Sequence, residues 1–181
     1  MITGTERTVY LIKKGIIDLL KVKSLKQITV NNICEQAMIG RSTFYNHYQD
    51  KYEVLEEINK NFTEKLDGFL QERFLLEDIE TILTALIVEF DHEAFSILIE
   101  IQEDQINLRQ DLKKVIQQNF AAFFSKEALG ESLDISFEFA KELFAGIALT
   151  FIEYSLKKGE VEKNTVFLNK AQKMLFRGET I

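Results

Sequence analysis

The sequence contains no proline, only eight glycines among its 181 residues, and a single cysteine. Because proline and glycine most often interrupt helices, their scarcity predicts long helices throughout the chain and an all-α fold. One cysteine excludes an internal disulfide. Cys34 falls on the apolar face of a predicted helix, so we expect a small core residue there.

Long apolar runs are missing as well. No segment approaches about 18 apolar residues without a charge, and no apolar stretch follows a basic N-terminus. We therefore expect no membrane span and no export signal, and a cytoplasmic location. With 46% hydrophobic and 28% charged residues, the composition is that of an ordinary globular protein with a buried core.

Motifs that carry catalysis are scarce. The two histidines, His47 and His92, are far apart in the sequence and stand in no metal-binding spacing. A phosphate-cradling glycine loop, a nucleophile elbow and a paired-cysteine motif are all missing. Adjacent acids such as Glu56 and Glu57 are typical of a solvated helix face. We expect neither an enzyme, nor a cofactor, nor a metal site.

The most informative stretch runs from Thr29 to Lys51, TVNNICEQAMIGRSTFYNHYQDK. Thr29 is a good N-cap, and a helix after it would bury one apolar face, made of Val30, Ile33, Cys34 and Ala37. Residues 38–40 interrupt that pattern. A second helix over residues 41–48 would keep only Phe44 and Tyr48 inward. Two short helices across a tight turn predict a helix-turn-helix.

The outward side of the second helix carries hydrogen-bonding side chains and no glutamate or lysine: Arg41, Ser42, Thr43, Tyr45, Asn46 and His47. In helix-turn-helix proteins the recognition helix offers its first residues to base edges. A helical hairpin buried inside an all-α protein would show the same apolar spacing, but its exposed face would normally carry glutamate and lysine. The composition of this face favours DNA binding.

The run ITVNNICEQAMIGRSTFYNHYQDKYEVL resembles the signature of the TetR family of transcriptional regulators. Matching positions hold Thr29, Ile33, Ala37, Thr43, Phe44, Tyr45, Tyr48, Lys51 and Leu55. The sequence departs from the signature at the turn glycine (Met38), at the cap of the recognition helix (Gly40) and at the end of helix one (Ser24). Methionine in a left-handed turn costs about 1 kcal/mol relative to glycine, so we expect a slightly strained turn.

Charge is divided unevenly along the chain. Residues 1–52 hold eight basic and four acidic residues, a net charge of +4, whereas the remainder holds 14 basic and 25 acidic residues, a net charge of −11. This asymmetry suits a small DNA-facing head on a body that phosphates repel.

The helix-turn-helix and a preceding helix over residues 6–22 would form a three-helix head, so we expect a DNA-binding domain at residues 1–50. Asp50 and Glu53 have capping-box spacing and predict a long fourth helix to about Leu70. By the resemblance, this helix joins the head to a helical regulatory domain at residues 51–181, which binds an effector and dimerises. Further helices are expected at residues 77–89, 92–101, 108–124, 135–158 and 163–176.

The chain has 15 phenylalanines, most of them in the body. Aromatic residues at helical spacing usually form a packed core. The resemblance implies that some of them line a pocket for an apolar or aromatic effector. The candidates are Phe62, Phe69, Phe90, His92, Phe95, Phe120, Phe124 and Phe144.

The last two predicted helices have apolar residues on more than one face, with small residues such as Ala145 and Gly146 between them. This pattern suits a helix buried between its own domain and a second protomer. The resemblance implies a homodimer through these helices. The alternative is a monomer with a docked C-terminal helix.

These features, with the resemblance, predict a homodimeric DNA-binding transcriptional regulator. It would repress transcription from a palindromic operator and leave the operator when a small-molecule effector binds. We expect Arg41, Ser42, Asn46 and Asn31 at base edges, and Thr29, Thr43, Tyr45, His47 and Lys51 at phosphates. The alternative is an adaptor on the TetR-like scaffold that acts through a protein partner or ligand without operator binding; the altered turn leaves room for it.

Overall fold

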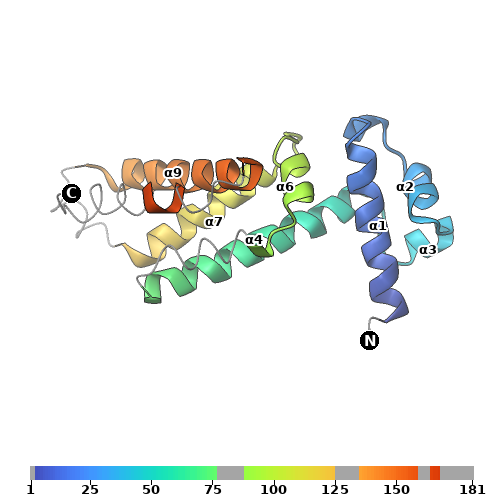
Figure 1. Cartoon of the computed structure of the whole chain (residues 1–181), viewed down its shortest axis with the longest axis horizontal. Helices are drawn as coiled ribbons and strands as arrows, with labels where there is room; N and C mark the ends of the chain where they lie inside the picture. The colour runs from blue at the N-terminus through green and yellow to red at the C-terminus, as the bar shows by residue number, and fades with distance from the viewer. Residues whose placement is uncertain (1–2, 77–87, 125–134, 159–163, 168–181) are drawn as a thin grey trace. The chain divides into compact units, whose positions relative to one another are not determined.

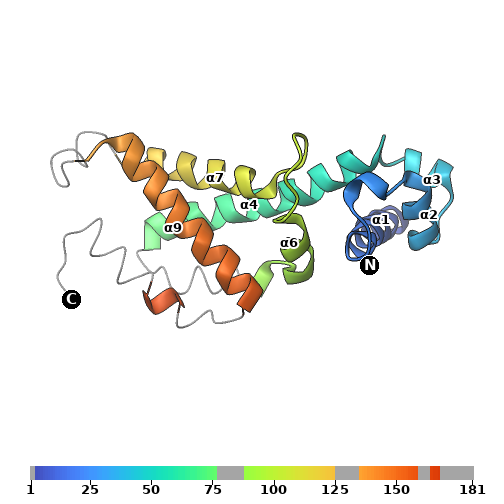
Figure 2. The same cartoon turned by 90° about the horizontal axis from the view of Figure 1, so that it is seen from above.

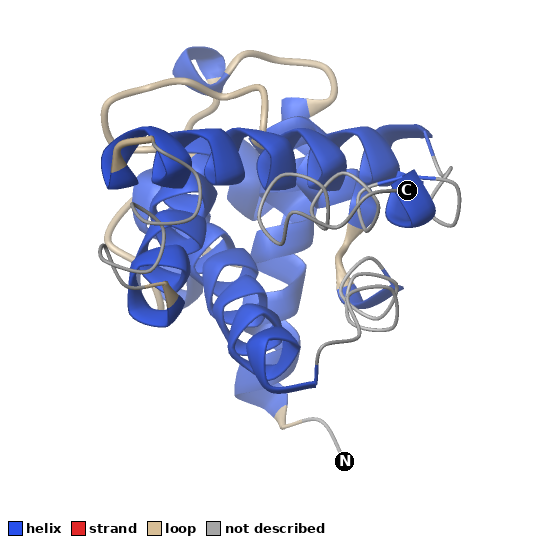
Figure 3. Cartoon of the chain, turned by 90° about the vertical axis from the view of Figure 1, so that its left-hand side faces the viewer, coloured by secondary structure: helices blue, strands red, loops and turns tan. Residues whose placement is uncertain are grey.

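The computed structural model describes residues 3–76, 88–124, 135–158 and 164–167 (Figure 1). These residues form helices and loops, and the one exception is an isolated antiparallel bridge between Glu103 and Ile106 (Figure 3). The elements in chain order are α1 (Gly4–Leu20), the 3-10 turn η1 (Leu25–Gln27), α2 (Val30–Ala37), α3 (Arg41–Tyr45), α4 (Lys51–Leu76), α6 (His92–Leu98), α7 (Leu108–Phe123) and α9 (Phe137–Lys158). The predicted all-α fold is confirmed. None of the described helices is long and apolar enough to cross a membrane.

The described residues group into two compact units. The first consists of residues 1–61 with residues 97–107, and the second of residues 62–96 with residues 108–181. The long helix α4 contributes residues to both units.

In the first unit, the core forms where α1 and α2 pack against each other. The inward face of α1 is formed by four fully or almost fully buried side chains, Ile12, Ile16, Ile17 and Leu19. A Cβ atom added at Gly15 would lie 3.5 Å from both the nitrogen of Ala37 and the oxygen of Ile33, so the two helices approach closely at this point.

Helix α1 begins two residues before the predicted start at residue 6. The reason is a capping box at Thr3, whose hydroxyl accepts a hydrogen bond from the Glu6 amide at 3.2 Å, while the Glu6 carboxylate accepts one from the Thr3 amide at 2.7 Å. This reciprocal pair satisfies amides that would otherwise lack a partner at the helix start.

In the second unit, α7 and α9 pack against each other and cross at an angle (Figure 2). Two ion pairs join these helices, between Lys113 and Glu142 at 2.6 Å and between Arg109 and Glu153 at 2.8 Å. The buried Asn119 of α7 also donates a hydrogen bond of 2.6 Å to Asp67 of α4.

Several other predicted helix boundaries need correction, and the first helix ends at Leu20 instead of residue 22. The helix expected at residues 92–101 ends at Leu98, because the amides of Glu100 and Ile101 bond to carbonyls three residues back and the chain then turns into the Glu103–Ile106 bridge. The helix expected at 135–158 begins at Phe137, next to Ser136, whose hydroxyl accepts a hydrogen bond from the Phe139 amide. The fourth helix runs to Leu76. The helix expected at residues 77–89 falls almost wholly outside the described residues, and of the one at 163–176 only residues 164–167 are described, as helix.

Candidate nucleic-acid interface

Helix α2 starts after Thr29, the predicted N-cap, which also forms a capping box that was not predicted. The hydroxyl of Thr29 accepts from the Asn32 amide at 3.2 Å, and the Asn32 side-chain oxygen accepts from the Thr29 amide at 3.1 Å. Asn32 was not among the predicted site residues, although its spacing of three from Thr29 is a recognisable signal. An amide in place of the common glutamate closes this box without a negative charge. Asn31, one position earlier, is exposed.

The turn between α2 and α3 has the left-handed conformation that the sequence predicts. Met38 has φ 53° and ψ 47°, and it is the only non-glycine residue with positive φ in the described part of the chain. The amide of Ile39 then bonds to the Cys34 oxygen at 3.0 Å, which closes the helix end. The Met38 side chain is 89% exposed, so no packing offsets the cost of this backbone conformation.

Helix α3 is shorter than predicted and ends at Tyr45 instead of residue 48. After Tyr45 the hydrogen bonds tighten, because the His47 amide bonds to the Phe44 oxygen three residues back. Gly40, its N-cap, has no side chain to bond the helix start. The predicted faces hold: Phe44 is fully buried, whereas Arg41 and Asn46 are exposed.

The other candidate contact residues of α3 and its C-terminal turn differ in exposure. Ser42 and Tyr45 are exposed, whereas Thr43 and His47 are half-buried. The guanidinium carbon of Arg41 lies 5.8 Å from the centre of the Tyr45 ring, a cation–π arrangement that restrains both exposed side chains. The surface therefore offers a guanidinium, hydroxyls and an amide, with no carboxylate in α3.

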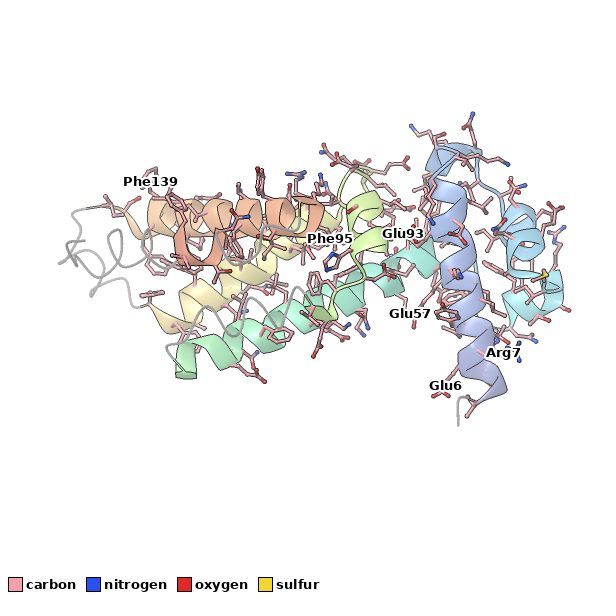
Figure 4. The ribbon with its side chains drawn as sticks, in the orientation of Figure 1. Glu6, Arg7, Glu57, Glu93, Phe95 and Phe139 are labelled. Carbon is pink, nitrogen blue, oxygen red and sulfur yellow. The ribbon has the colours of Figure 1, made fainter. Side chains whose placement is uncertain are left out.

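The end of this segment is held by a polar link that the sequence did not reveal. The Tyr48 hydroxyl donates to Glu57 Oε2 at 2.6 Å, and Lys13 Nζ lies 2.9 Å from Glu57 Oε1. In Figure 4, Glu57 points from α4 toward α1. Glu57 was expected on a solvated face, and its side chain is indeed exposed at 48%. Its two partners were not expected, because no local spacing connects residues 13, 48 and 57.

Burial and the bond to Glu57 raise the pKa of the Tyr48 hydroxyl, so it stays a proton donor. Partial burial by itself raises the pKa of Glu57, but the hydrogen bonds from Tyr48 and Lys13 outweigh it and leave the pKa below its ordinary value. Glu57 is therefore an ionised acceptor for both partners.

Lys51 was predicted to contact a phosphate. The structure places its ammonium 2.6 Å from the oxygen of Leu25, the first residue of η1, and 2.8 Å from the oxygen of Ile28, the C-cap of η1. Two of its three N–H donors are thus used inside the first unit. A phosphate contact by Lys51 stays a prediction.

Cys34 lies on the inward face of α2 and is 4% exposed. Burial raises the pKa of its thiol, which keeps it protonated and unreactive. The predicted core role is confirmed.

Six of the eight candidate pocket residues fall into two aromatic clusters, both in the second unit. Phe62, Phe90 and Phe95 have ring centres 5.0 to 5.8 Å apart, and Figure 4 shows Phe95 reaching from α6 toward α4. The other cluster is centred on Phe120, whose ring centre lies 4.7 to 5.7 Å from those of its neighbours, Phe124, Phe137 and Phe144.

The two remaining candidates differ in exposure. Phe69 is half-buried on α4, and His92 is exposed at the start of α6. A separate open groove of about 570 Å³ lies along α9 and residues 164–167, and Ile147, Phe151, Tyr154 and Phe167 are among its lining residues. The groove is lined by residues of the two helices that were predicted to form the dimer interface.

No family model matches the chain. An uncharacterised helix-turn-helix-type transcriptional regulator of Bacillus subtilis (strain 168), YxbF, is 24% identical over 115 residues, which are 60% of this chain and only 30% of that protein.

Solved structures resemble the chain over nearly its whole length. The TetR transcriptional regulator of Streptococcus agalactiae 2603V has a TM-score of 0.65 at 20% identity, covering 92% of this chain and 94% of that one. NalD of Pseudomonas aeruginosa, the secondary repressor of the MexAB-OprM multidrug efflux pump, has a TM-score of 0.62 at 18% identity, covering 97% of both chains. The chain therefore has the all-α fold of the TetR-family transcriptional regulators, the family that its helix-turn-helix signature resembles.

Proposed function

We propose that the chain is a DNA-binding transcriptional regulator of the TetR type, with residues 1–50 as the DNA-binding domain and residues 51–181 as the regulatory domain. The exposed face of α3 carries this proposal. Arg41, Ser42 and Asn46 project into solvent above the buried Phe44, and α3 holds no carboxylate that phosphates would repel. A surface helix without a binding role would normally carry glutamate and lysine on this face.

The proposed contacts divide by chemistry. Arg41 and Asn46 can form bidentate hydrogen bonds with guanine and adenine edges, respectively, and Ser42 and Asn31 complete the base-reading set. The proposed phosphate contacts are Thr29, Thr43, Tyr45, His47 and Lys51. The net charge of +4 on residues 1–52 supports this orientation toward DNA.

The regulatory domain is proposed to bind a small apolar or aromatic effector and to dimerise. The two phenylalanine clusters support an aromatic-lined site at Phe62, Phe69, Phe90, His92, Phe95, Phe120, Phe124 and Phe144. The apolar groove on α9, with the exposed Tyr154 among its lining residues, supports a homodimer interface. The exposed Phe139 of the same helix supports it too (Figure 4).

In the proposed mechanism, two heads of a dimer enter successive major grooves of a palindromic operator and block transcription. Effector binding in the regulatory domain changes the spacing of the heads through α4, which contributes residues to both units. Repression is the proposed default direction of control; NalD, which shares the fold, is a repressor.

A selection of bound fragments from genomic DNA tests the proposal, with the Tyr45→Ala variant in parallel. We expect one palindromic site that the variant loses. A dimer making about six to ten phosphate contacts should also lose about 10³- to 10⁵-fold in affinity between about 50 and 200 mM salt.

The competing function is an adaptor that uses the same scaffold without an operator. The departures from the family signature at Met38 and Gly40 leave room for it, although the backbone of Met38 keeps the left-handed conformation of the turn. If a folded and dimeric protein recovers no specific fragment, the proposal of a DNA-binding regulator is refuted. The adaptor, which acts through a protein partner or ligand, is then favoured.

A further inference from the structure

Helix α3 cannot fix its own orientation. It has five residues, its N-cap Gly40 contributes no side-chain hydrogen bond, and isolated helices of this length are unstable in water. The direction in which Arg41 and Asn46 point therefore depends on how the rest of the head holds α3 and the turn that follows it.

Two buried aromatic residues hold this segment, and they do so differently. Phe44 is fully buried and packs without directional preference. Tyr48 is 4% exposed, its ring centre lies 6.0 Å from that of Phe44, and its hydroxyl bonds to Glu57 of α4. A phenylalanine at position 48 would fill the same space but could not make this directional bond.

The Glu57 carboxylate is itself held in place. Oε2 accepts from Tyr48 at 2.6 Å, while Oε1 lies 2.9 Å from the ammonium of Lys13 on α1. One carboxylate thus links the end of the recognition segment to both α4 and α1. Hydrogen bonds to charged groups are shorter and stronger than neutral ones, and an acceptor held from a second side loses less freedom when it binds.

We propose that Lys13, Glu57 and Tyr48 form a positioning link that sets the orientation of α3 and thereby the base discrimination of the protein. The inference rests on the proposed function, since discrimination exists only if α3 reads DNA. Bidentate contacts to base edges require close alignment, whereas phosphate contacts tolerate small displacements. Loosening the link should therefore reduce specificity more than overall affinity.

The test compares the wild type with Tyr48→Phe, Glu57→Gln and Lys13→Met. For each protein, dissociation constants are measured for the selected operator, for its single-base variants and for random-sequence DNA, at one fixed salt concentration. We expect the ratio of operator to random-sequence affinity to fall about 3- to 10-fold in Tyr48→Phe, the range that corresponds to the net worth of one hydrogen bond. Affinity for random DNA should change less than twofold.

Two control variants and an unfolding measurement distinguish loss of the link from loss of a negative charge and from loss of folding stability. Glu56→Gln removes the same charge from an exposed neighbour on α4 and should keep the discrimination of the wild type. The double variant Tyr48→Phe/Glu57→Gln should lose no more discrimination than its more affected single variant, because both changes break one link. Chemical unfolding of each variant ensures that binding is compared between folded proteins.

If folded Tyr48→Phe keeps the wild-type ratio of operator to random-sequence affinity but has a lower unfolding midpoint, the link is only a stabilising contact. That result would overturn this inference and leave the proposed function untouched. Additive losses in the double variant would also overturn the inference. Absence of any operator preference in the wild type would instead refute the proposed function, and the inference with it.

Discussion

The ammonium of Lys51 lies 2.6 Å from the backbone oxygen of Leu25, a residue 26 positions earlier in the chain. A second bond of 2.8 Å to the Ile28 oxygen means that the first turn of α4 holds both ends of η1, directly before the N-cap of α2. Lys51 therefore contributes to the structure of the head before any DNA is present.

Replacing Lys51 by methionine keeps the apolar stem and removes the ammonium. We expect the free energy of unfolding to fall by about 1 to 3 kcal/mol, because two carbonyls lose a charged donor. Urea unfolding measures this loss, and Lys14→Met, at an exposed position of α1, is the matched control. An unchanged free energy of unfolding together with a lower salt dependence of DNA binding would make Lys51 a phosphate ligand only.

Met38→Gly should stabilise the protein by up to about 1 kcal/mol, because glycine adopts positive φ without the steric cost that Met38 bears. Little packing is lost, since the Met38 side chain is 89% exposed. Thermal unfolding compares this variant with Met38→Ala, which keeps the strained backbone and should unfold close to the wild type. A glycine variant less stable than the alanine variant would contradict the expected strain.

Arg41→Ala and Tyr45→Ala should weaken DNA binding in different ways. Loss of Arg41 should cost about 1 to 3 kcal/mol at the base pair that it reads and relax the preference there. Loss of Tyr45 should weaken binding to all sequences alike, because its proposed contact is a phosphate. Binding to a set of single-base operator variants measures both. An equal loss at every base for Arg41→Ala would remove Arg41 from the base-reading set.

Glu57 should make stability depend on pH in the acid range. Its pKa in the folded protein is below the ordinary value of 4.5, because Tyr48 and Lys13 favour the ionised form. The contribution of ionised Glu57 to the free energy of unfolding is therefore fully present above about pH 4.5, and it is lost as the pH falls through the pKa that Glu57 has in the folded protein. The difference in unfolding free energy between wild type and Glu57→Gln should shrink from pH 7 to about pH 3. A difference independent of pH, or an equal trend in Glu56→Gln, would show that Glu57 is not held in this way.

The head could be predicted from the sequence because its signals are local. The apolar spacing at Ile33 and Ala37 places one face of α2 inward, and the hydroxyl of Thr29 caps the helix that follows it. The left-handed turn at Met38 was equally predictable, because the position is recognised from the family signature and the backbone cost is a property of the residue. The exposure of Arg41 and Asn46 follows from helical geometry once Phe44 is buried.

Other features depend on residues that only the folded chain brings together. Glu57 meets Tyr48 and Lys13 from two other segments, and Lys51 meets carbonyls 23 and 26 positions away, so no periodicity could reveal either set of partners. The sequence shows how many phenylalanines the body contains, but their division into two clusters depends on how α4, α6, α7 and α9 pack. Sequence thus determined which residues form helices and which side faces inward, because those follow from local hydrogen bonding and apolar burial. Tertiary structure decided which polar groups pair, because pairing requires atoms within about 3 Å of each other across different helices.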